Sequence, residues 1–318
     1  MAASIESTSF RWLRNGDMAF AEMLAAIAAA RHSVRLETYR FHSGSPGNQF
    51  LEALVRAQQR GVRTYVIADA WGSQELADSY WEPLRTAGGE FRWFNERNHR
   101  GFVFRDHRKL LVCDERVAFV GGFNLAPEYA GDGVTHGWCD VGLQLEGPLA
   151  SLLAESFDKM FTRAELRHGA FMRVMRTGAH ARIAHADGEL LMSGPGRGFS
   201  TLKRALRMDL KHARRVQVMA AYFLPTWKLR RELQTVARRG GQVQLMFATA
   251  ATVAPHMKSG RLKALAVTSA QPSALLPGMP TVAASGLPSY ESVASFGVLA
   301  PAKTPAASSD SSRSTAST

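Results

Sequence analysis

Residues 107–124, HRKLLVCDERVAFVGGFN, combine an imidazole, an ammonium group, a buried-strand pattern and a glycine pair. His107 and Lys109 are two positions apart, so in a strand their side chains face the same side. Gly121 and Gly122 allow a tight backbone bend that leaves room for a ligand, and Asn124 adds an amide donor. A nucleophilic imidazole, with a cation and an amide to stabilise phosphate oxygens, is what attack on a phosphodiester requires. Because the protein supplies the fixed positive charge, we expect no metal and no cofactor.

The sequence on either side of this stretch contains an internal repeat. Residues 30–69 run from the β-rich ARHSVRLETY through a helix-like stretch and a glycine to a second β-rich run, RTYVIAD. Residues 213–248 repeat this order from ARRVQVMAAY to GGQVQLMFA, and the helix-like stretches before the two copies, 17–32 and 199–215, also correspond. The repeat aligns Arg60-Gly61 with Arg239-Gly240. Strand, helix and strand in this order predict parallel pairing through crossover helices, and therefore two α/β halves.

Only the first copy continues with the remaining elements of such a half. It goes on with strand candidates and a closing helix candidate, at 90–94, 109–115, 117–124, 141–147 and 148–161. After about residue 250 the composition changes to Ala, Ser, Pro and Val with few charges, and residues 307–318 have no apolar content to bury. We therefore expect an α/β chain whose second half is cut short and whose last residues are disordered.

Composition indicates which partners and which cellular compartment to expect. Lys and Arg exceed Asp and Glu by 12, so the chain suits an anionic partner, nucleic acid or an anionic lipid surface, although free use of Arg on a solvated surface gives the same count. No run reaches the ~18 apolar residues of a membrane-spanning helix. The N-terminus has no signal-peptide pattern, and Cys113 and Cys139 lack metal-ligand spacing. We expect a cytoplasmic protein.

The spacing His-x-Lys, four residues, Asp, six residues, Gly-Gly-x-Asn resembles the signature of the phospholipase D superfamily. Every position of it is present: His107, Lys109, Asp114, Gly121, Gly122 and Asn124. The flanking stretches resemble bacterial cardiolipin synthases in particular, and they read RLETYRF, ADAWGS, TAGGEFRWFN and NLAPEYAG. The resemblance extends from about residue 10 to residue 248, and it implies a phospholipase D-like layered α/β fold.

By this resemblance His107 is the nucleophile that forms a phosphohistidine, and Lys109 and Asn124 bind the phosphate with the glycine pair. Asp114 belongs to the motif but is expected to support the loop rather than to touch substrate. Asp140 matches a carboxylate that orients the nucleophilic imidazole, although a solvated acid at a strand edge would look the same. Tyr39 and Tyr222 occupy matching positions of the repeat and are candidates to wall the substrate channel, or to be core tyrosines.

The superfamily uses two facing His-x-Lys motifs, one histidine attacking and the other protonating the leaving oxygen. The repeat offset places the second histidine near residue 286, where the sequence reads ASGLPSYE. His256-x-Lys258 is a decoy, because Lys263 stands at the Asp position and no Gly-Gly-x-Asn follows. The general acid is therefore expected to be missing from this chain.

A second resemblance covers residues 255–306, through HMKSGRLKALAVTSA, LPGMPTVAASGLPSYE and FGVLAPAKTP. It points to the C-terminal part of the substrate-binding proteins of tripartite tricarboxylate transporters. About fifty residues do not rebuild a two-lobed receptor, so solute binding is the least favoured function. The expected domains are a first phospholipase D-like half at 1–165, an incomplete second half at 166–250, a receptor-like fragment at 251–306 and a tail at 307–318.

These observations favour phosphatidyl transfer of the cardiolipin synthase kind, from phosphatidylglycerol to an alcohol, through a covalent intermediate on His107. The alternatives are an inactive protein that binds anionic membranes, and a homodimeric single-motif phosphodiesterase or nuclease in which two copies of His107 meet. The expected partners are an anionic phospholipid and the inner face of the cell membrane, where the protein is peripheral. Nucleic acid is the less favoured partner.

Overall fold

The computed structural model describes residues 7–94, 105–164, 181–185, 188–192, 201–219, 225–246, 263–273 and 276–286, with 288 and 291. They belong to two compact units, Met1–Leu202 and Lys203–Thr318. Tyr222, the decoy His256-x-Lys258 and the expected domain boundaries near 165, 250 and 306 lie outside the described residues. Those boundaries therefore stay predictions.

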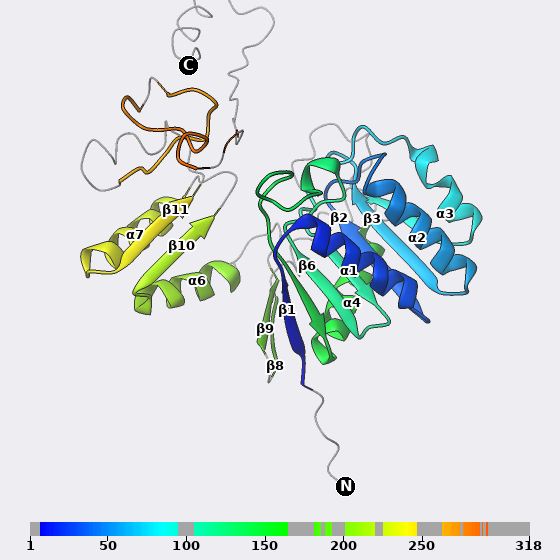
Figure 1. Cartoon of the computed structure of the whole chain (residues 1–318). Coiled ribbons are helices and arrows are strands. Elements are labelled where there is room, and N and C mark those ends of the chain that lie inside the picture. Colours follow the sequence, from blue (N-terminus) through cyan, green and yellow to red (C-terminus); the bar gives the residue numbers. More distant parts are fainter. Residues whose placement is uncertain are drawn as a thin grey trace, which may run out of the picture. The chain divides into compact units, whose positions relative to one another are not determined.

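The first unit is built on a mixed seven-stranded sheet (Figure 1). Its strands follow the spatial order β1 (Ser9–Leu13), β7 (Gly142–Glu146), β6 (Val117–Gly121), β5 (Leu110–Cys113), β2 (Ser33–Thr38), β3 (Arg63–Asp69) and β4 (Glu90–Phe94). β2, β3 and β4 are parallel to one another, as the strand–helix–strand order predicts, and every other pairing in the sheet is antiparallel. The α/β fold expected from sequence is confirmed.

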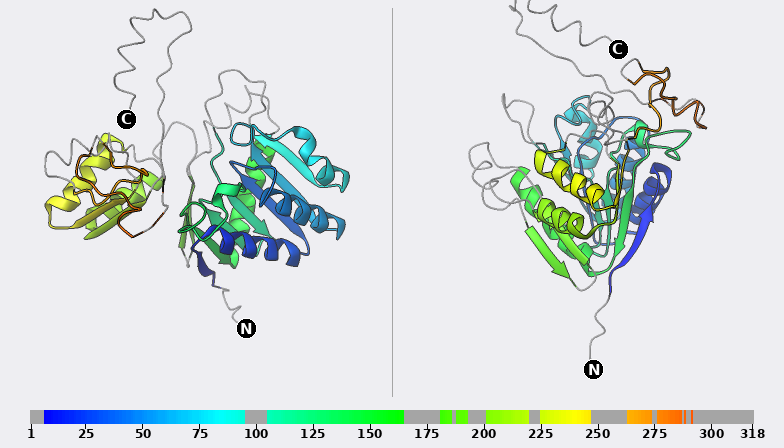
Figure 2. Two further views of the ribbon diagram at one scale, coloured as in Figure 1. Left: turned by 45° about the horizontal axis from the view of Figure 1, so that its top comes forward. Right: turned by 90° about the vertical axis from the view of Figure 1, so that its left-hand side faces the viewer.

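Helices cover both faces of this sheet (Figures 1 and 2). One face packs against α1 (Gly16–Ala29), α2 (Gly47–Gln59) and the short α3 (Glu82–Thr86), which follows the 3₁₀ turn η1 (Asp78–Trp81). Among the helices that the structure describes, α4 (Pro148–Ala164) packs against the other face. Alternate residues of one strand enter the two cores, as Val66 does on the first face and Ile67 on the second. The site therefore lies on a sheet that is buried on both sides.

The turn between β5 and β6 shows why the motif folds as a hairpin. Asp114 and Glu115 both have positive φ, 52° and 57°, which is the left-handed conformation that tight hairpin turns require. The N–H of Arg116 donates to the carbonyl of Cys113 at 3.1 Å and closes the turn. The strands are consequently shorter than the runs 109–115 and 117–124 expected from sequence.

The second unit repeats the beginning of the first. α6 (Thr201–His212), β10 (Arg215–Met219), α7 (Trp227–Arg238) and β11 (Gln242–Met246) follow in order, and β10 and β11 are parallel. Gly61 and Gly240 share nearly the same positive φ, 87° and 85°. Arg60 donates to the carbonyls of Ile27 and Ala28 at the end of α1, and Arg239 donates to those of Leu210, Lys211 and Ala213 at the end of α6. The internal repeat is thus present in the backbone and in its helix caps.

Three smaller features complete the description. The strands β8 (Ala181–His185) and β9 (Gly188–Met192) form an antiparallel hairpin that the sequence patterns did not predict. An isolated bridge joins Val267 to Thr281. Among the helices that the structure describes, none has the length and apolar character needed to cross a membrane.

Candidate active site

Most of the candidate residues lie at one edge of the sheet, because the strands that carry them start or end there. β2 ends next to the start of β5, and β6 ends next to the start of β7, since both pairs are antiparallel. Tyr39 follows β2, His107 precedes β5, the glycine pair ends β6, and Asp140 precedes β7. The antiparallel pairing therefore brings Tyr39 and Asp140, about 100 residues apart in sequence, to the same edge of the sheet.

His107, Lys109 and Tyr39 form the centre of this edge. The ammonium of Lys109 lies 3.2 Å from Nδ1 of His107 and donates to the carbonyl of His107 at 3.0 Å. The ring of Tyr39 lies 4.7 Å from the imidazole, centroid to centroid, and Nζ of Lys109 is 5.4 Å from the Tyr39 ring. With Lys109 donating to Nδ1, the neutral imidazole carries its proton on Nε2. His107 is exposed, so the group faces solvent.

The electrostatics of the pair suit a neutral imidazole beside a cation. Partial burial and the Lys109 ammonium lower the pKa of His107, and Asp106 opposes them, so His107 is uncharged near pH 7. Burial lowers the pKa of Lys109 to about 8, against the opposing carboxylates of Asp106, Asp140 and Asp69. A neutral imidazole is a nucleophile, and an ammonium attracts a phosphodiester.

Gly121 and Gly122 are explained by neighbouring atoms that approach the backbone too closely for a side chain. A Cβ on Gly121 would lie 2.6 Å from Cα of Gly142 and 2.7 Å from the carbonyl oxygen of Val141, so β6 and β7 meet too closely for a side chain. A Cβ on Gly122 would lie 2.0 Å from Oδ1 of Asp140. The second glycine therefore makes room for the Asp140 carboxylate. That carboxylate accepts from the N–H of Val141 at 2.7 Å, and no hydrogen bond between Asp140 and His107 occurs among the described residues.

Asn124 is buried and engaged within the protein. Its Oδ1 accepts from the N–H of Arg40 at 3.1 Å, and its Nδ2 donates to the hydroxyl of Tyr129 at 2.7 Å. Asn124 thus ties the end of β2 to the loop after β6, and at most one amide hydrogen remains for a phosphate. Sequence reasoning did not single out Tyr129.

Asp114 lies at the opposite end of β5 from His107. Its carboxylate accepts from the N–H groups of Arg31, His32 and Ser33 at 2.9, 2.7 and 2.9 Å. Partial burial alone would raise its pKa, but these three donors outweigh burial and hold the pKa of Asp114 below its ordinary value. The structure therefore does not bring Asp114 together with the other motif residues.

Two further acids, Asp69 and Asp106, support the segment that carries His107. Asp69 is buried at the end of β3, and its Oδ2 accepts from the N–H of Asp106 at 2.9 Å while its Oδ1 accepts from Trp71 and Gly72. Asp106 is also buried, and its Oδ1 accepts from the N–H of Arg108 at 3.2 Å. An acid closing the apolar run RTYVIAD was the available sequence signal for Asp69.

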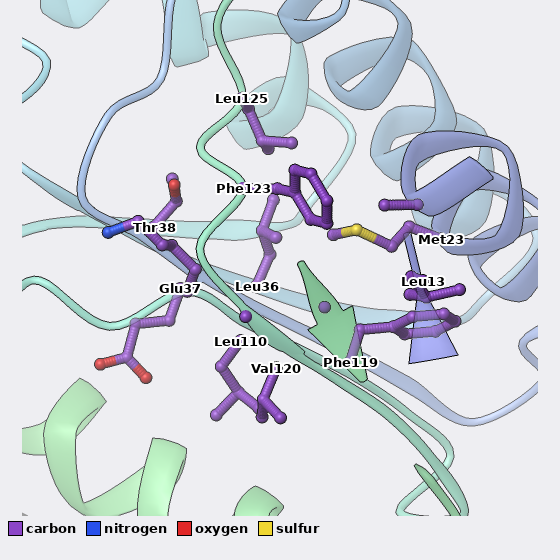
Figure 3. A pocket seen from close by; sticks show the side chains of 14 residues that line it. Leu13, Met23, Leu36, Glu37, Thr38, Leu110, Phe119, Val120, Phe123 and Leu125 are labelled. Carbon is purple, nitrogen blue, oxygen red and sulfur yellow. The ribbon is translucent and has the colours of Figure 1, made fainter. Parts of the chain in front are cut away.

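A small cavity lies beneath the site, between α1 and the strands β2, β5 and β6 (Figure 3). Its lining is mainly apolar, with Met23, Leu36, Phe119 and Phe123 among its walls. Its volume of about 20 Å³ has room for one water molecule and no acyl chain. A substrate therefore has to approach His107 from the solvent side. No cluster of metal-binding side chains occurs in the part of the chain that the structure describes.

Comparison with known proteins finds similarity to one enzyme family over much of the chain. Residues 23–161 match the family described as cardiolipin synthase, PLD-like domain. Cardiolipin synthase B of Salmonella typhi is 31% identical over 253 residues, covering 76% of this chain and 60% of the relative. Cardiolipin synthase B of Escherichia coli K12 is 29% identical over 248 residues with the same coverage. The chain thus spans about 60% of the length of these relatives.

Two other similarities concern the fold and the C-terminal region. The crystal structure of phosphatidylserine synthase from Haemophilus influenzae superimposes with a TM-score of 0.60 at 14% identity, covering 77% of this chain and 62% of that structure. This likeness shows a shared fold. Residues 231–311 match the tripartite tricarboxylate transporter family receptor, so the C-terminal resemblance is confirmed, and the match begins inside α7.

Proposed function

Because residues 23–161 belong to the phospholipase D-like domain family of the cardiolipin synthases, we propose that this chain transfers phosphatidyl groups through a covalent bond to His107. The observation that carries the proposal is the exposed His107, a neutral imidazole 3.2 Å from the Lys109 ammonium. The donor is an anionic phospholipid such as phosphatidylglycerol, and the acceptor is an alcohol.

The proposed first step begins when a substrate phosphate binds Lys109 and draws its ammonium away from Nδ1. The imidazole proton can then reside on Nδ1, where Asp140 is the proposed hydrogen-bond acceptor, and Nε2 attacks phosphorus. A nitrogen–phosphorus bond forms as the bond from phosphorus to the glycerol oxygen breaks, and that oxygen takes up a proton from water. Lys109 neutralises charge on the phosphate oxygens during this step.

The proton for the leaving oxygen is the weak point of this mechanism. The sequence holds no second complete His-x-Lys motif to supply it. Loss of a general acid typically slows a reaction ~10²–10⁴-fold. Because this proton is needed in the step that forms the nitrogen–phosphorus bond, we expect formation of the phosphohistidine, and with it overall transfer, to be slow.

A transfer assay tests the proposal. The full-length chain is incubated with radiolabelled phosphatidylglycerol vesicles, and labelled products are separated by chromatography. We expect slow product formation that is lost in His107→Ala and kept in His212→Ala, which removes an exposed histidine of α6. Equal product from both variants, or none from the folded wild type, would reject transfer. Degradation of plasmid DNA in EDTA that depends on His107 would favour the nuclease alternative instead.

A second observation favours an anionic membrane as partner. Residues 201–246 contain eleven Lys and Arg against two acids, a net charge of +9. Leu202, Met208 and Trp227 are exposed in the same stretch at 52%, 52% and 60%. Basic helices with exposed apolar side chains bind the interface of anionic bilayers.

Liposome flotation tests this partner. The protein should float with vesicles containing phosphatidylglycerol and remain unbound with phosphatidylcholine alone. Arg204→Glu with Lys211→Glu should weaken binding several-fold, whereas Arg63→Glu with Arg116→Glu, the same charge change on exposed residues of the first unit, should have a smaller effect. Equal losses in the two pairs would mean that net charge, not this surface, governs binding.

A further inference from the structure

The segment that carries His107 and Lys109 is held by carboxylates rather than by pairing with another strand. The N–H of Asp106 donates to Asp69, and the N–H of Arg108 donates to Asp106, at 2.9 and 3.2 Å. Neither N–H has a backbone partner among the described residues. The course of the backbone through His107 is therefore set by the positions of acidic side chains.

Arg108 extends to the opposite side of the segment from its two neighbours. In an extended chain the side chain of residue 108 points away from those of 107 and 109. Its Nη2 lies 3.1 Å from Oε2 of Glu37, whose side chain is fully buried on β2. Figure 3 shows Glu37 pointing away from Met23, Leu36 and Phe123, that is, away from the core under α1. The ion pair thus anchors the segment on the side of β2 that faces away from α1.

Glu37 and Asp106 are both buried, at 0% and 4% exposure. The carboxyl group of Asp106 adds to burial in raising the pKa of Glu37. Oε1 of Glu37 and Oδ2 of Asp106 have no donor among the described residues. Two buried carboxylates side by side do not both ionise, and one shared proton supplies the missing donor to both. Burial raises the pKa of Glu37 well above its ordinary value, with Arg108 opposing, as such sharing requires.

We propose that Glu37 and Arg108 are positioning residues that hold His107 against Lys109. The anchor fixes Arg108 on the inner side, so that the imidazole and the ammonium are presented together on the outer side. This inference goes beyond phosphatidyl transfer and concerns how the reactive pair is built, whatever phosphodiester it meets.

The test measures the titration of His107 in the full-length protein by carbon–proton NMR of its imidazole, assigned with His107→Ala. In Glu37→Met the anchor is lost, Lys109 separates from His107, and the pKa of His107 rises toward the ordinary histidine value. The same substitution in a Lys109→Met background, where no ammonium can move, should leave the pKa of His107 unchanged, so a rise seen only when Lys109 is present reports movement of the ammonium and not a changed charge. Glu37→Gln keeps an amide donor for Asp106 and an oxygen for Arg108, and should titrate like the wild type.

Arg35→Met is the control on the same strand, because Arg35 is buried on β2 and forms an ion pair with the half-exposed Asp158 of α4, at 2.8 Å. It should lower stability without moving the titration of His107. If Glu37→Met does not fold, Arg108→Lys keeps the charge, removes the planar fork and should shift His107 in the same direction. An unchanged titration in a folded anchor variant, or an equal shift in Arg35→Met, overturns the proposal. The NMR titration needs no turnover. Failure of the positioning proposal can therefore be distinguished from failure of phosphatidyl transfer.

Discussion

At the scale of single residues, Lys109 is the group whose charge state governs the site. Burial brings its pKa to about 8 even though Asp106, Asp140 and Asp69 all favour the ammonium. The ammonium is therefore present below pH 8 and is lost as the pH rises through that value. Its lowered pKa could not be predicted from the sequence, since the pKa depends on how deeply Lys109 is buried and on acids from β3, from the loop before β7 and from the segment before β5.

Anion binding should follow this titration. We expect the affinity for tungstate, a phosphate analogue of constant charge, to fall as the pH rises from 7 to 9.5, with a midpoint near or somewhat above 8 because the bound anion favours the ammonium. In Lys109→Arg the charge persists, so the affinity should stay flat over this range. Calorimetry measures both. The same decline in Lys109→Arg would assign the titration to another group.

At the scale of elements, the repeat and the motif predicted local structure well and long-range pairing poorly. The helix, glycine and strand of each copy agree with the sequence pattern, down to the positive φ of Gly61 and Gly240. The capping of α1 by Arg60 and of α6 by Arg239 explains why an Arg precedes each of these glycines. By contrast, the pairing of β1 with β7 joins segments about 130 residues apart, and no local pattern encodes such a partner.

The glycine pair gives a prediction for the place where the end of β6 pairs with the start of β7. In Gly122→Ala the new Cβ meets the end of a flexible side chain, so Asp140 should move at a cost of less than ~1 kcal/mol in unfolding free energy. In Gly121→Ala it meets backbone of β7, and overpacking should cost about 1–3 kcal/mol. Urea denaturation compares the two variants. The covalent step should be slowed more by Gly122→Ala than its small stability loss explains, and the reverse pattern would contradict the role given to Asp140.

At the scale of the whole molecule, the two units differ in how much core they possess. The first unit has two large clusters of buried side chains on either face of its sheet. In the second unit the described cluster contains three buried residues, Leu210, Leu233 and Val236. Stability scales with buried apolar area, so the second unit should open at a lower free energy.

Hydrogen exchange under mild denaturant tests this difference. Amides of β2, β3 and β5 should exchange only through global unfolding, whereas those of β10 and β11 should exchange through a smaller opening at lower denaturant. Uniform protection of the two sheets would show that the units unfold together.

The organisation of the site could be predicted from sequence only in part. The motif spacing led to His107 and Lys109, the internal repeat to Tyr39 and the family resemblance to Asp140, because all three can be read along the sequence. That these residues lie at one edge of the sheet follows from the antiparallel strand pairing. Glu37, Asp69 and Asp106 could not be assigned roles, because their contacts join three strands and depend on burial. A charged residue within an otherwise buried strand, as in SVRLET, was the signal for Glu37.

The most direct test of the central claim is detection of a phosphohistidine on the intact chain. The protein is incubated with phosphatidylglycerol carrying ³²P in its phosphate, quenched in alkali and analysed for protein-bound label. We predict a label that survives alkali, is released by acid, is absent from His107→Ala and is present in His212→Ala. A folded wild-type protein that takes up no label, or a label that persists in His107→Ala, would contradict the account.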